Sequence, residues 1–213
     1  MNRKEKVLSF WDKLKPTLES MILKPDADVM DRLEKKELLT YLPSVKGKDV
    51  LELGAGIGRY TSHFALKANH VTTSDIVPKF IEKSKEHNAA FSNISYIAED
   101  AMKLEFSKEK FDFIFINWLF MFLEDDEVEH LTNKFLDWLK PDGIIFFRES
   151  CNVPERRRTD HYYANYRNFH FYTRTFSKKF TLLKHDNIKN SEIHFSDPFQ
   201  CFWLFQKAAS VIQ

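Results

Sequence analysis

The chain has 213 residues and a formal net charge of +1, with 43% hydrophobic and 30% charged residues. This size and balance are typical of one globular domain, and the near-neutral charge favours neither nucleic acid nor a membrane surface as a partner. No apolar stretch approaches the roughly 20 residues that span a bilayer, and Cys151 and Cys201 are the two cysteines. We therefore expect a cytoplasmic monomer with a small-molecule substrate, no metal, no disulfide framework and no membrane insertion.

Two helices are predicted ahead of residue 45. In the stretch EKVLSFWDKL, residues 5–14, apolar residues recur at helical spacing, and Pro16 marks the end of the helix. A second helix is predicted over residues 26–42, with Asp26 as a candidate cap at its start and Pro43 just beyond its end.

From residue 49 the pattern changes to short apolar strands that alternate with helices. Such alternation is typical of an α/β fold, a parallel sheet with helices on both faces. The chain becomes basic and aromatic after residue 150, and residues 199–207 are predicted as a last strand that runs antiparallel in the same sheet. The other predicted strands cover residues 49–54, 70–75, 94–100 and 111–120, and residues 141–150 are predicted as a turn followed by a strand. The predicted helices cover residues 59–68, 77–91 and 125–139.

Three of the five glycines in the chain, Gly54, Gly56 and Gly58, fall within five residues between the first strand and the helix that follows. Glycines at such a turn let the backbone approach a ligand without an intervening side chain. By itself the turn also fits dinucleotide binding, so the neighbouring residues have to decide the ligand.

Acidic residues near this turn narrow the choice of ligand. Asp75 ends the second strand, where a carboxylate can accept hydrogen bonds from ribose hydroxyls, and Asp100 follows the third strand, where it can accept from the exocyclic amine of a base. Glu52 precedes the turn, where an acid would repel a pyrophosphate yet suit a cation. S-adenosyl-L-methionine carries a sulfonium and an ammonium but no phosphate, so the three acids together predict this cofactor. The alternative is that each acid is a solvated residue at a strand end.

With these residues in place, the chain resembles the phosphoethanolamine N-methyltransferases, especially the amino-terminal domain of the two-domain plant enzymes and its nematode relative. The similar stretches, from about residue 8 to 208, are TLESMIL, DVLELGAGIGRYT, NISYIAEDA, INWLFMFLEDDEV, WLKPDGIIFFRESC, NYRNFHFYTRTF and FWLFQK. The resemblance implies a class I S-adenosylmethionine-dependent methyltransferase fold, which is Rossmann-like with a mostly parallel sheet. It implies a single domain over residues 1–213, with a helical lid (1–45), a cofactor-binding core (46–150), and a substrate-binding segment with the final strands (151–213).

The same resemblance implies functional residues by position. Cofactor contacts are implied at Gly54, Arg59, Asp75, Asp100, Ala101 and Asn117, and the predicted cofactor site also includes Glu52, Gly56 and Ile76. Ser150, Tyr166, Arg167 and Tyr172 fall where the family holds the phosphate and amine of its substrate. The implied reaction transfers one methyl group from S-adenosylmethionine to phosphoethanolamine. It gives phosphomonomethylethanolamine, for phosphocholine synthesis, and S-adenosyl-L-homocysteine.

The residue types suit that substrate. The guanidinium of Arg167, with tyrosine hydroxyls beside it, can bind phosphate through charge-assisted hydrogen bonds. The amine has to lose a proton before it attacks the methyl carbon, and the candidate catalytic residues for that step are His161, Tyr162, Tyr166 and Tyr172. The alternative is that residues 156–174 form an ordinary basic surface segment.

The chain departs from the family pattern at two places. Single-domain protozoal members place a catalytic histidine after the fourth strand, where this chain has an aromatic segment with Trp118 and Phe122. The residue before Tyr166 is usually histidine in the family and is Asn165 here. Two rival hypotheses follow: a methyltransferase for another small amine, and a protein that binds the cofactor without turnover and serves as a partner subunit. A NAD-dependent oxidoreductase fits the acids around the glycine turn poorly.

Overall fold

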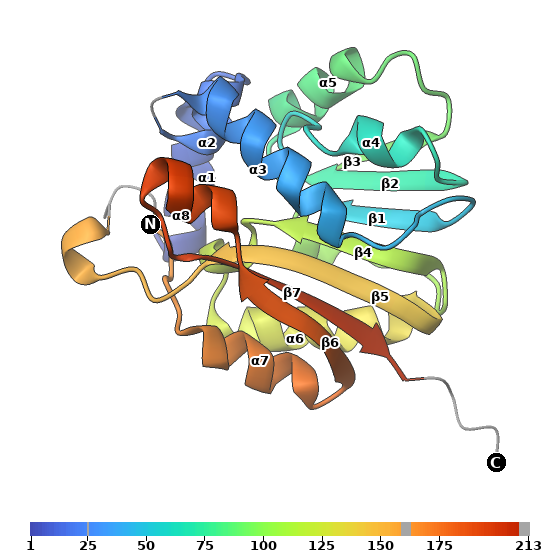
Figure 1. The fold of residues 1–213 in the computed structure, drawn as a ribbon. Coiled ribbons are helices and arrows are strands. Elements are labelled where there is room, and N and C mark those ends of the chain that lie inside the picture. Colours follow the sequence, from blue (N-terminus) through green and yellow to red (C-terminus); the bar gives the residue numbers. More distant parts are fainter. Residues whose placement is uncertain (25, 159–162, 209–213) are drawn as a thin grey trace.

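The computed structural model describes residues 1–24, 26–158 and 163–208. Within them, seven strands form one sheet in the order β3-β2-β1-β4-β5-β7-β6, with helices on both faces (Figure 1). The strands are β1 (Asp49–Leu53), β2 (His70–Asp75), β3 (Ile94–Ala98), β4 (Phe111–Asn117), β5 (Leu139–Ser150), β6 (Phe180–Asn187) and β7 (Gln200–Lys207). The α-helices are α1 (Arg3–Lys13), α2 (Leu18–Ile22), α3 (Ala27–Tyr41), α4 (Thr61–Ala65), α5 (Pro78–His87), α6 (Asp125–Trp138), α7 (Phe169–Ser177) and α8 (Lys189–Phe195). Short 3-10 helices are η1 (Ala101–Lys103), η2 (Phe120–Phe122) and η3 (Glu155–Arg157).

Strands β1 to β5 run parallel, as the alternation of strands and helices predicts. β7 lies antiparallel between β5 and β6, which confirms the prediction of an antiparallel last strand. β1 pairs with β2 on one side and with β4 on the other, so the strand order reverses between β1 and β4. Ligands of open α/β sheets bind at such a switch point, outside the carboxyl ends of the strands.

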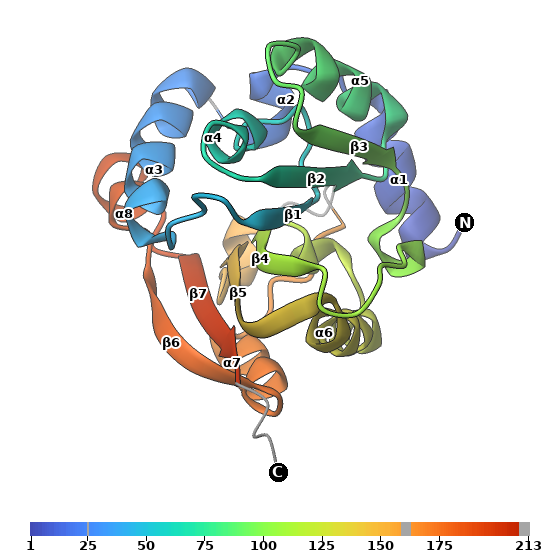
Figure 2. The ribbon, with the colours of Figure 1, turned by 90° about the vertical axis from the view of Figure 1, so that its right-hand side faces the viewer.

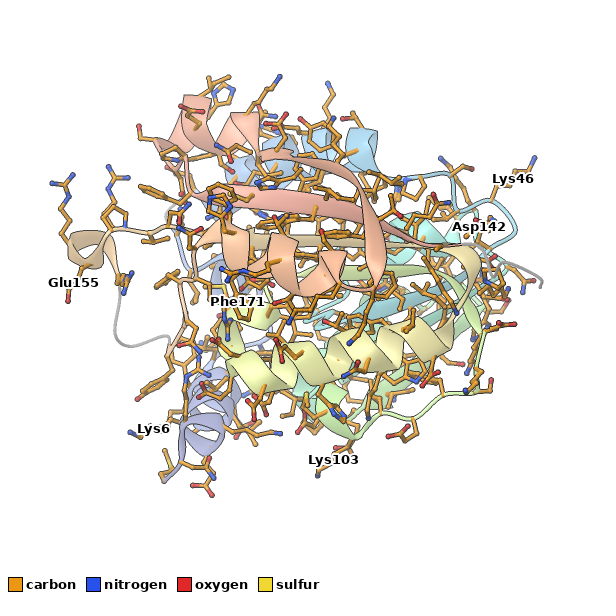
Figure 3. The ribbon with its side chains drawn as sticks, turned by 90° about the horizontal axis from the view of Figure 1, so that it is seen from below. Lys6, Lys46, Lys103, Asp142, Glu155 and Phe171 are labelled. Carbon is orange, nitrogen blue, oxygen red and sulfur yellow. The ribbon has the colours of Figure 1, made fainter. Side chains whose placement is uncertain are left out.

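Helices cover both faces of the sheet, and alternate residues of its central strands point to the two opposite faces. On one side, Leu51, Ile114 and Phe147 pack with side chains of α6 and α7. These two helices lie side by side across that face of the sheet (Figure 3). On the other side, Val50 and Phe115 pack with side chains of α3 and α4, and Figure 2 shows the two helix layers on either side of the strands.

The helices differ from the predicted ones mainly at their ends. α4 covers only Thr61–Ala65, whereas the sequence pattern predicts residues 59–68. Asp26 stands at the N-cap of α3, as predicted, but it lies in the left-handed region, with φ of 57°, and its side chain makes no capping hydrogen bond. The same helix ends at Tyr41, two residues before Pro43, as predicted. The sequence pattern predicts none of α7, β6 and α8.

Helices α1 and α2 lie at the carboxyl ends of the parallel strands. Trp11 of α1 makes edge-to-face contacts with Phe80 of α5 and Phe122 of η2, at centroid distances of 6.3 and 5.4 Å. The guanidinium of Arg3 donates hydrogen bonds to the carbonyl oxygens of Met121 and Phe122, both at 3.2 Å. These contacts hold the amino-terminal helices over the edge of the sheet where the glycine turn lies.

In the described part of the chain, no helix combines the length and apolar character that crossing a bilayer requires. The same part holds no cluster of three or more His, Cys, Asp or Glu side chains arranged to bind a metal ion.

Candidate functional site

A cavity of about 230 Å³ opens at the carboxyl ends of β1, β2 and β4, against α1 and α2. It extends to Ser150 and Tyr166, two of the predicted substrate-binding residues. The carboxyl ends of parallel strands meet at one edge of the sheet, and this geometry brings together residues that are far apart in the sequence. All the predicted cofactor-binding residues line the cavity: Glu52, Gly54, Gly56, Arg59, Asp75, Ile76, Asp100, Ala101 and Asn117.

The glycine turn has backbone conformations that suit glycine at each of its three positions, with φ of 66° at Gly54, 55° at Gly56 and 79° at Gly58. Gly54 and Gly56 border the cavity, and a Cβ atom on Gly56 would lie 2.7 Å from the sulfur of Met21. Gly58 faces α5 instead, where a Cβ atom would lie 2.6 Å from Nδ2 of Asn88. Two glycines thus open the backbone to the cavity, and the third permits close packing of α5.

Asp75 ties the glycine turn to the end of β2. Its Oδ2 accepts a hydrogen bond from the backbone N–H of Gly56 at 2.9 Å, and its Oδ1 accepts one from Val77 at 2.9 Å. Burial raises the pKa of the Asp75 carboxyl to about 6, although these N–H groups favour the charged form. Each carboxylate oxygen has a second lone pair, which can accept a hydroxyl from a ligand in the cavity.

Asp100 and Asn117 bring further acceptors to the same cavity. Oδ1 of Asp100 accepts a hydrogen bond from the N–H of Met102 at 3.0 Å, and Oδ2 forms an ion pair with Lys4 of α1. Oδ1 of Asn117 is buried and has no hydrogen-bond partner among the described residues. A buried polar atom without a partner costs free energy, so Asn117 is suited to a ligand that donates a hydrogen bond.

Glu52 and Arg59 are held by neighbouring side chains. Oε2 of Glu52 accepts hydrogen bonds from the hydroxyls of Thr61 and Thr73, at 2.5 and 3.1 Å. Burial raises the pKa of the Glu52 carboxyl to about 7. Arg59 donates from Nε to Oδ1 of Asp31 at 2.8 Å, so its guanidinium is bound to α3.

The lining therefore fits S-adenosylmethionine. Carboxylate and amide oxygens of Glu52, Asp75, Asp100 and Asn117 border the cavity, and such acceptors suit ribose hydroxyls, an exocyclic amine and a positively charged ligand. The same lining suits a pyrophosphate poorly, because several carboxylates would face its negative charge.

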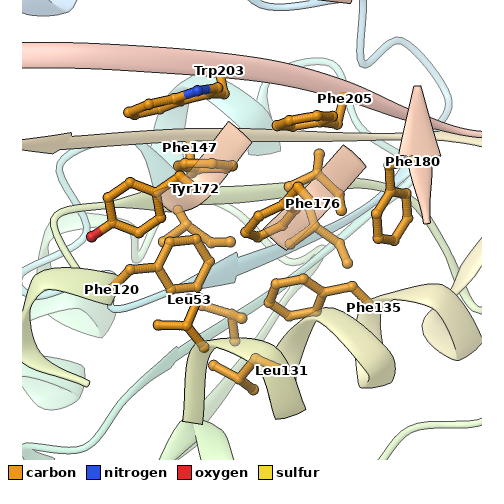
Figure 4. Close-up of a cluster of buried hydrophobic side chains, with 14 of the residues drawn as sticks. Leu53, Phe120, Leu131, Phe135, Phe147, Tyr172, Phe176, Phe180, Trp203 and Phe205 are labelled. Carbon is orange, nitrogen blue, oxygen red and sulfur yellow. The ribbon is translucent and has the colours of Figure 1, made fainter. Parts of the chain in front are cut away.

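The predicted substrate-binding residues divide into two groups. Ser150 and Tyr166 line the cavity, whereas Tyr172 is fully buried in an aromatic cluster between β5, β7 and α7 (Figure 4). Its ring lies 5.7 Å from that of Phe147 and 5.3 Å from that of Trp203, and burial raises its pKa well above the ordinary tyrosine value. The structure thus places Tyr172 outside the lining of the cavity.

Arg167 also lies outside the lining of this cavity. Its guanidinium donates to the carbonyl oxygens of Phe120 at 2.7 Å and Leu123 at 2.5 Å, and Nε donates to Oδ1 of Asp125 at 2.7 Å. These bonds fasten the segment after β5 to the loop before α6. The roles predicted for Arg167 and Tyr172 in substrate binding stay predictions, and His161 and Tyr162 lie outside the described residues.

A buried carboxylate shapes the wall of the cavity. Glu149 of β5 accepts backbone hydrogen bonds from Leu119 at 3.0 Å, Phe120 at 2.7 Å and Met121 at 3.1 Å. Its burial raises its pKa to about 7. Because Leu119 and Met121 line the cavity, Glu149 fixes part of the wall without facing the ligand.

A polar network that the sequence pattern does not predict lies beside Ser150. Nε1 of Trp118 donates to Oε1 of Gln200 at 2.8 Å, and Nε2 of Gln200 donates to Oγ of Ser150 at 2.8 Å and to Oδ2 of Asp197 at 3.2 Å. Asp197 also forms an ion pair with Lys24. Trp118, Ser150, Gln200 and Lys24 all line the cavity. Nothing in the sequence pattern singles out Gln200, which takes part only because β7 pairs with β5.

Comparisons with known proteins agree with this geometry. A methyltransferase domain family matches residues 50–143. Phosphoethanolamine N-methyltransferase 1 of Triticum aestivum is 40% identical over 178 residues, which are 80% of this chain and 35% of that protein. Phosphoethanolamine N-methyltransferase 1 of Caenorhabditis elegans is 38% identical over 159 residues, which are 74% of this chain and 34% of that protein. The chain thus matches about a third of the length of these relatives.

A solved structure resembles nearly the whole chain. Phosphoethanolamine N-methyltransferase 1 of Haemonchus contortus, in complex with phosphoethanolamine and S-adenosylhomocysteine, has a TM-score of 0.91 and 32% identity, over 99% of this chain and 50% of that chain. An S-adenosylmethionine-dependent methyltransferase from Leishmania major, with a TM-score of 0.80 and 21% identity, shares the fold. The chain therefore has the class I S-adenosylmethionine-dependent methyltransferase fold, and its sequence is similar to that of the phosphoethanolamine N-methyltransferases over most of its length.

Proposed function

We propose that this chain is an N-methyltransferase that transfers one methyl group from S-adenosylmethionine to phosphoethanolamine, giving phosphomonomethylethanolamine in the synthesis of phosphocholine. One observation carries the proposal: a single cavity joins all the predicted cofactor-binding residues to Ser150 and Tyr166. The similarity to phosphoethanolamine N-methyltransferases over most of the chain supports the choice of acceptor.

The cofactor supplies a methyl group on a positively charged sulfur. In this proposal Asp75 accepts from the ribose hydroxyls, and Asp100 accepts from the exocyclic amine after Lys4 releases its Oδ2. Oδ1 of Asn117, which has no partner among the described residues, accepts from the ammonium of the methionine part in the same proposal. These acceptors orient the ligand and hold it still, and positioning of two bound reactants supplies much of the catalysis in such a transfer.

The acceptor side of the cavity lies between the end of β5 and the segment that contains Tyr166. Ser150 and Tyr166 line it there, beside the ring of Trp118. Among the described residues, Tyr166 is the candidate base that borders the cavity. An aromatic ring nearby stabilises the ammonium that forms when the nitrogen gains a methyl group. We further propose that α1 and α2, which line the cavity through Trp11 and Met21, act as a lid over both ligands.

A second candidate function is methyl transfer to another small amine. It is favoured by the position of Arg167, because the cation predicted to hold a phosphate donates instead to two carbonyl oxygens and to Asp125. Ethanolamine, which lacks the phosphate, separates the two functions.

The test compares kcat/KM for phosphoethanolamine and ethanolamine at saturating S-adenosylmethionine, with product masses as the readout. We expect phosphoethanolamine to be preferred by at least about tenfold, the effect of one additional hydrogen bond to a charged group. Equal or greater activity on ethanolamine would favour the second function. Binding of S-adenosylhomocysteine without turnover on either amine would instead support a partner protein that only binds the cofactor.

A further inference from the structure

Gln200 occupies a position that connects three parts of the acceptor side of the cavity. It begins β7 and pairs with Ser150, the last residue of β5, in the antiparallel ladder. Its side chain is buried, with an exposed fraction of 4%, and it contacts Trp118, Ser150 and Asp197. A buried carboxamide with three polar partners is well suited to fix the directions of their hydrogen bonds.

Two independent contacts determine how the Gln200 amide is oriented. The indole Nε1 of Trp118 can only donate, so the atom that faces it at 2.8 Å has to be the carbonyl oxygen of Gln200. A carboxylate can only accept, so the atom that faces Oδ2 of Asp197 at 3.2 Å has to be the NH₂ group. Both requirements give the same orientation. The NH₂ group then also faces Oγ of Ser150, at 2.8 Å.

This orientation determines the role of the Ser150 hydroxyl. Because its oxygen accepts from Gln200, its proton has to point elsewhere, and within the described residues it donates to no protein acceptor. Ser150 lines the cavity. We propose that Gln200 is a positioning residue that makes Ser150 a hydrogen-bond donor into the cavity, and so selects acceptor substrates that carry an anionic oxygen.

The charge on the neighbouring wall supports the same class of acceptor. Lys24, which follows α2, lines the cavity, and its ammonium is paired with Asp197, which also accepts from Gln200. The network therefore puts the ammonium of Lys24 and the hydroxyl donor of Ser150 on one side of the cavity. The side around Asp75 carries hydrogen-bond acceptors instead. An anionic phosphate accepts hydrogen bonds from both Ser150 and Lys24, whereas an ammonium could accept from neither.

This inference rests on the proposed function for its substrate, and Gln200→Glu is the variant that tests it. A glutamate accepts from Trp118 as glutamine does, but its second oxygen accepts from Ser150 instead of donating to it. The Ser150 proton then turns away from the cavity. We expect the KM for phosphoethanolamine to rise about 10- to 100-fold, the loss of one hydrogen bond to a charged group. The affinity for S-adenosylhomocysteine should stay within about twofold, and the kcat/KM for ethanolamine should change much less than that for phosphoethanolamine.

The control is a double-mutant cycle with Ser150→Ala. If Gln200 acts through Ser150, Gln200→Glu raises the KM no further when Ser150 is already alanine. Additive effects would overturn the inference, and so would an equal loss on ethanolamine. Gln200→Met keeps the volume and removes both polar groups, which leaves the Ser150 hydroxyl free to turn. The KM of Gln200→Met for phosphoethanolamine should fall between those of the parent and Gln200→Glu. This variant replaces Gln200→Glu in the test if the glutamate variant does not fold.

Binding of inorganic phosphate separates this inference from the proposed function. We expect phosphate to bind the parent protein in the presence of S-adenosylhomocysteine. Its affinity for Gln200→Glu and for Ser150→Ala should be at least about tenfold lower. This result without turnover of phosphoethanolamine would support the donor role and refute the proposed substrate. Equal phosphate affinity in all three proteins would refute the donor role, whatever the substrate.

Discussion

Gly58 and Gly47 make a matched pair that tests why the turn after β1 is rich in glycine. Both have left-handed backbone conformations, with φ of 79° at Gly58 and 68° at Gly47. A Cβ atom on Gly47 would meet nothing within 4 Å, whereas one on Gly58 would lie 2.6 Å from Nδ2 of Asn88 and 3.0 Å from Cβ of Ser84. Substitution by alanine therefore costs backbone strain at both positions and a steric clash at only one.

The magnitudes follow from these contacts. Alanine in the left-handed region costs about 1–2 kcal/mol, part of which is offset by the reduced freedom of the unfolded chain. We therefore expect Gly47→Ala to lower the free energy of unfolding by about 1 kcal/mol. Ser84 and Asn88 are 0% and 1% exposed, so they cannot swing into solvent, and α5 has to move. Overpacking of this kind costs a further 1–3 kcal/mol or so, which brings the loss for Gly58→Ala to about 2–4 kcal/mol.

The assay is equilibrium unfolding in urea, monitored by circular dichroism and analysed with a common m-value. Gly58→Ala should have a clearly lower midpoint than Gly47→Ala. Equal losses of stability in the two variants would refute the claim that Gly58 is required by the close approach of α5.

Three further predictions concern carboxyl groups of the sheet, on β2, β1 and β5. Asp75→Asn places an NH₂ group against one of two backbone donors, those of Gly56 and Val77. We therefore expect the affinity for S-adenosylhomocysteine to fall at least about tenfold in calorimetric titration. Unchanged affinity would contradict the role of Asp75. Glu52 has a pKa raised from 4.5 to about 7, so it favours the neutral form in the folded state. Its contribution to the free energy of unfolding is complete below about pH 4.5 and is lost as the pH rises through 7, by up to about 3 kcal/mol. Glu52→Gln should flatten this dependence in unfolding experiments between those pH values. An unchanged pH profile would count against a raised pKa. Glu149→Ala leaves three backbone N–H groups without an acceptor and should lower the free energy of unfolding by about 3 kcal/mol or more in a denaturation assay. The control, Glu129→Ala, removes an exposed ion pair and should cost less than about 1 kcal/mol in the same assay.

Much of the fold and of the cofactor site could be predicted because the signals are local. Runs such as residues 111–117 alternate between the two faces of a sheet that is buried on both sides, and the helices between the strands are amphipathic. Once the strands are parallel, their carboxyl ends meet at one edge, which is why Asp75 and Asp100 could be assigned to one site from the strand pattern. Asn117 was assigned through the family resemblance alone.

The acceptor side was harder to predict because its contacts join distant parts of the chain. Arg167 looks like a phosphate ligand in a basic segment, but its partners are carbonyl oxygens at Phe120 and Leu123, which the local sequence does not reveal. The stretch that forms α7 is dominated by aromatic rings, and its burial depends on β5 and β7. Gln200 acquires its partners only through the antiparallel pairing of β7 with β5.

Methyl transfer to phosphoethanolamine is tested most directly by incubating the protein with methyl-labelled S-adenosylmethionine and phosphoethanolamine and measuring the product masses over time. We expect a product that carries one labelled methyl group, formed together with S-adenosylhomocysteine, and a slower rate with Ser150→Ala. Tight binding of S-adenosylhomocysteine with no labelled phosphoethanolamine would contradict the proposed reaction, although the cofactor site would stand.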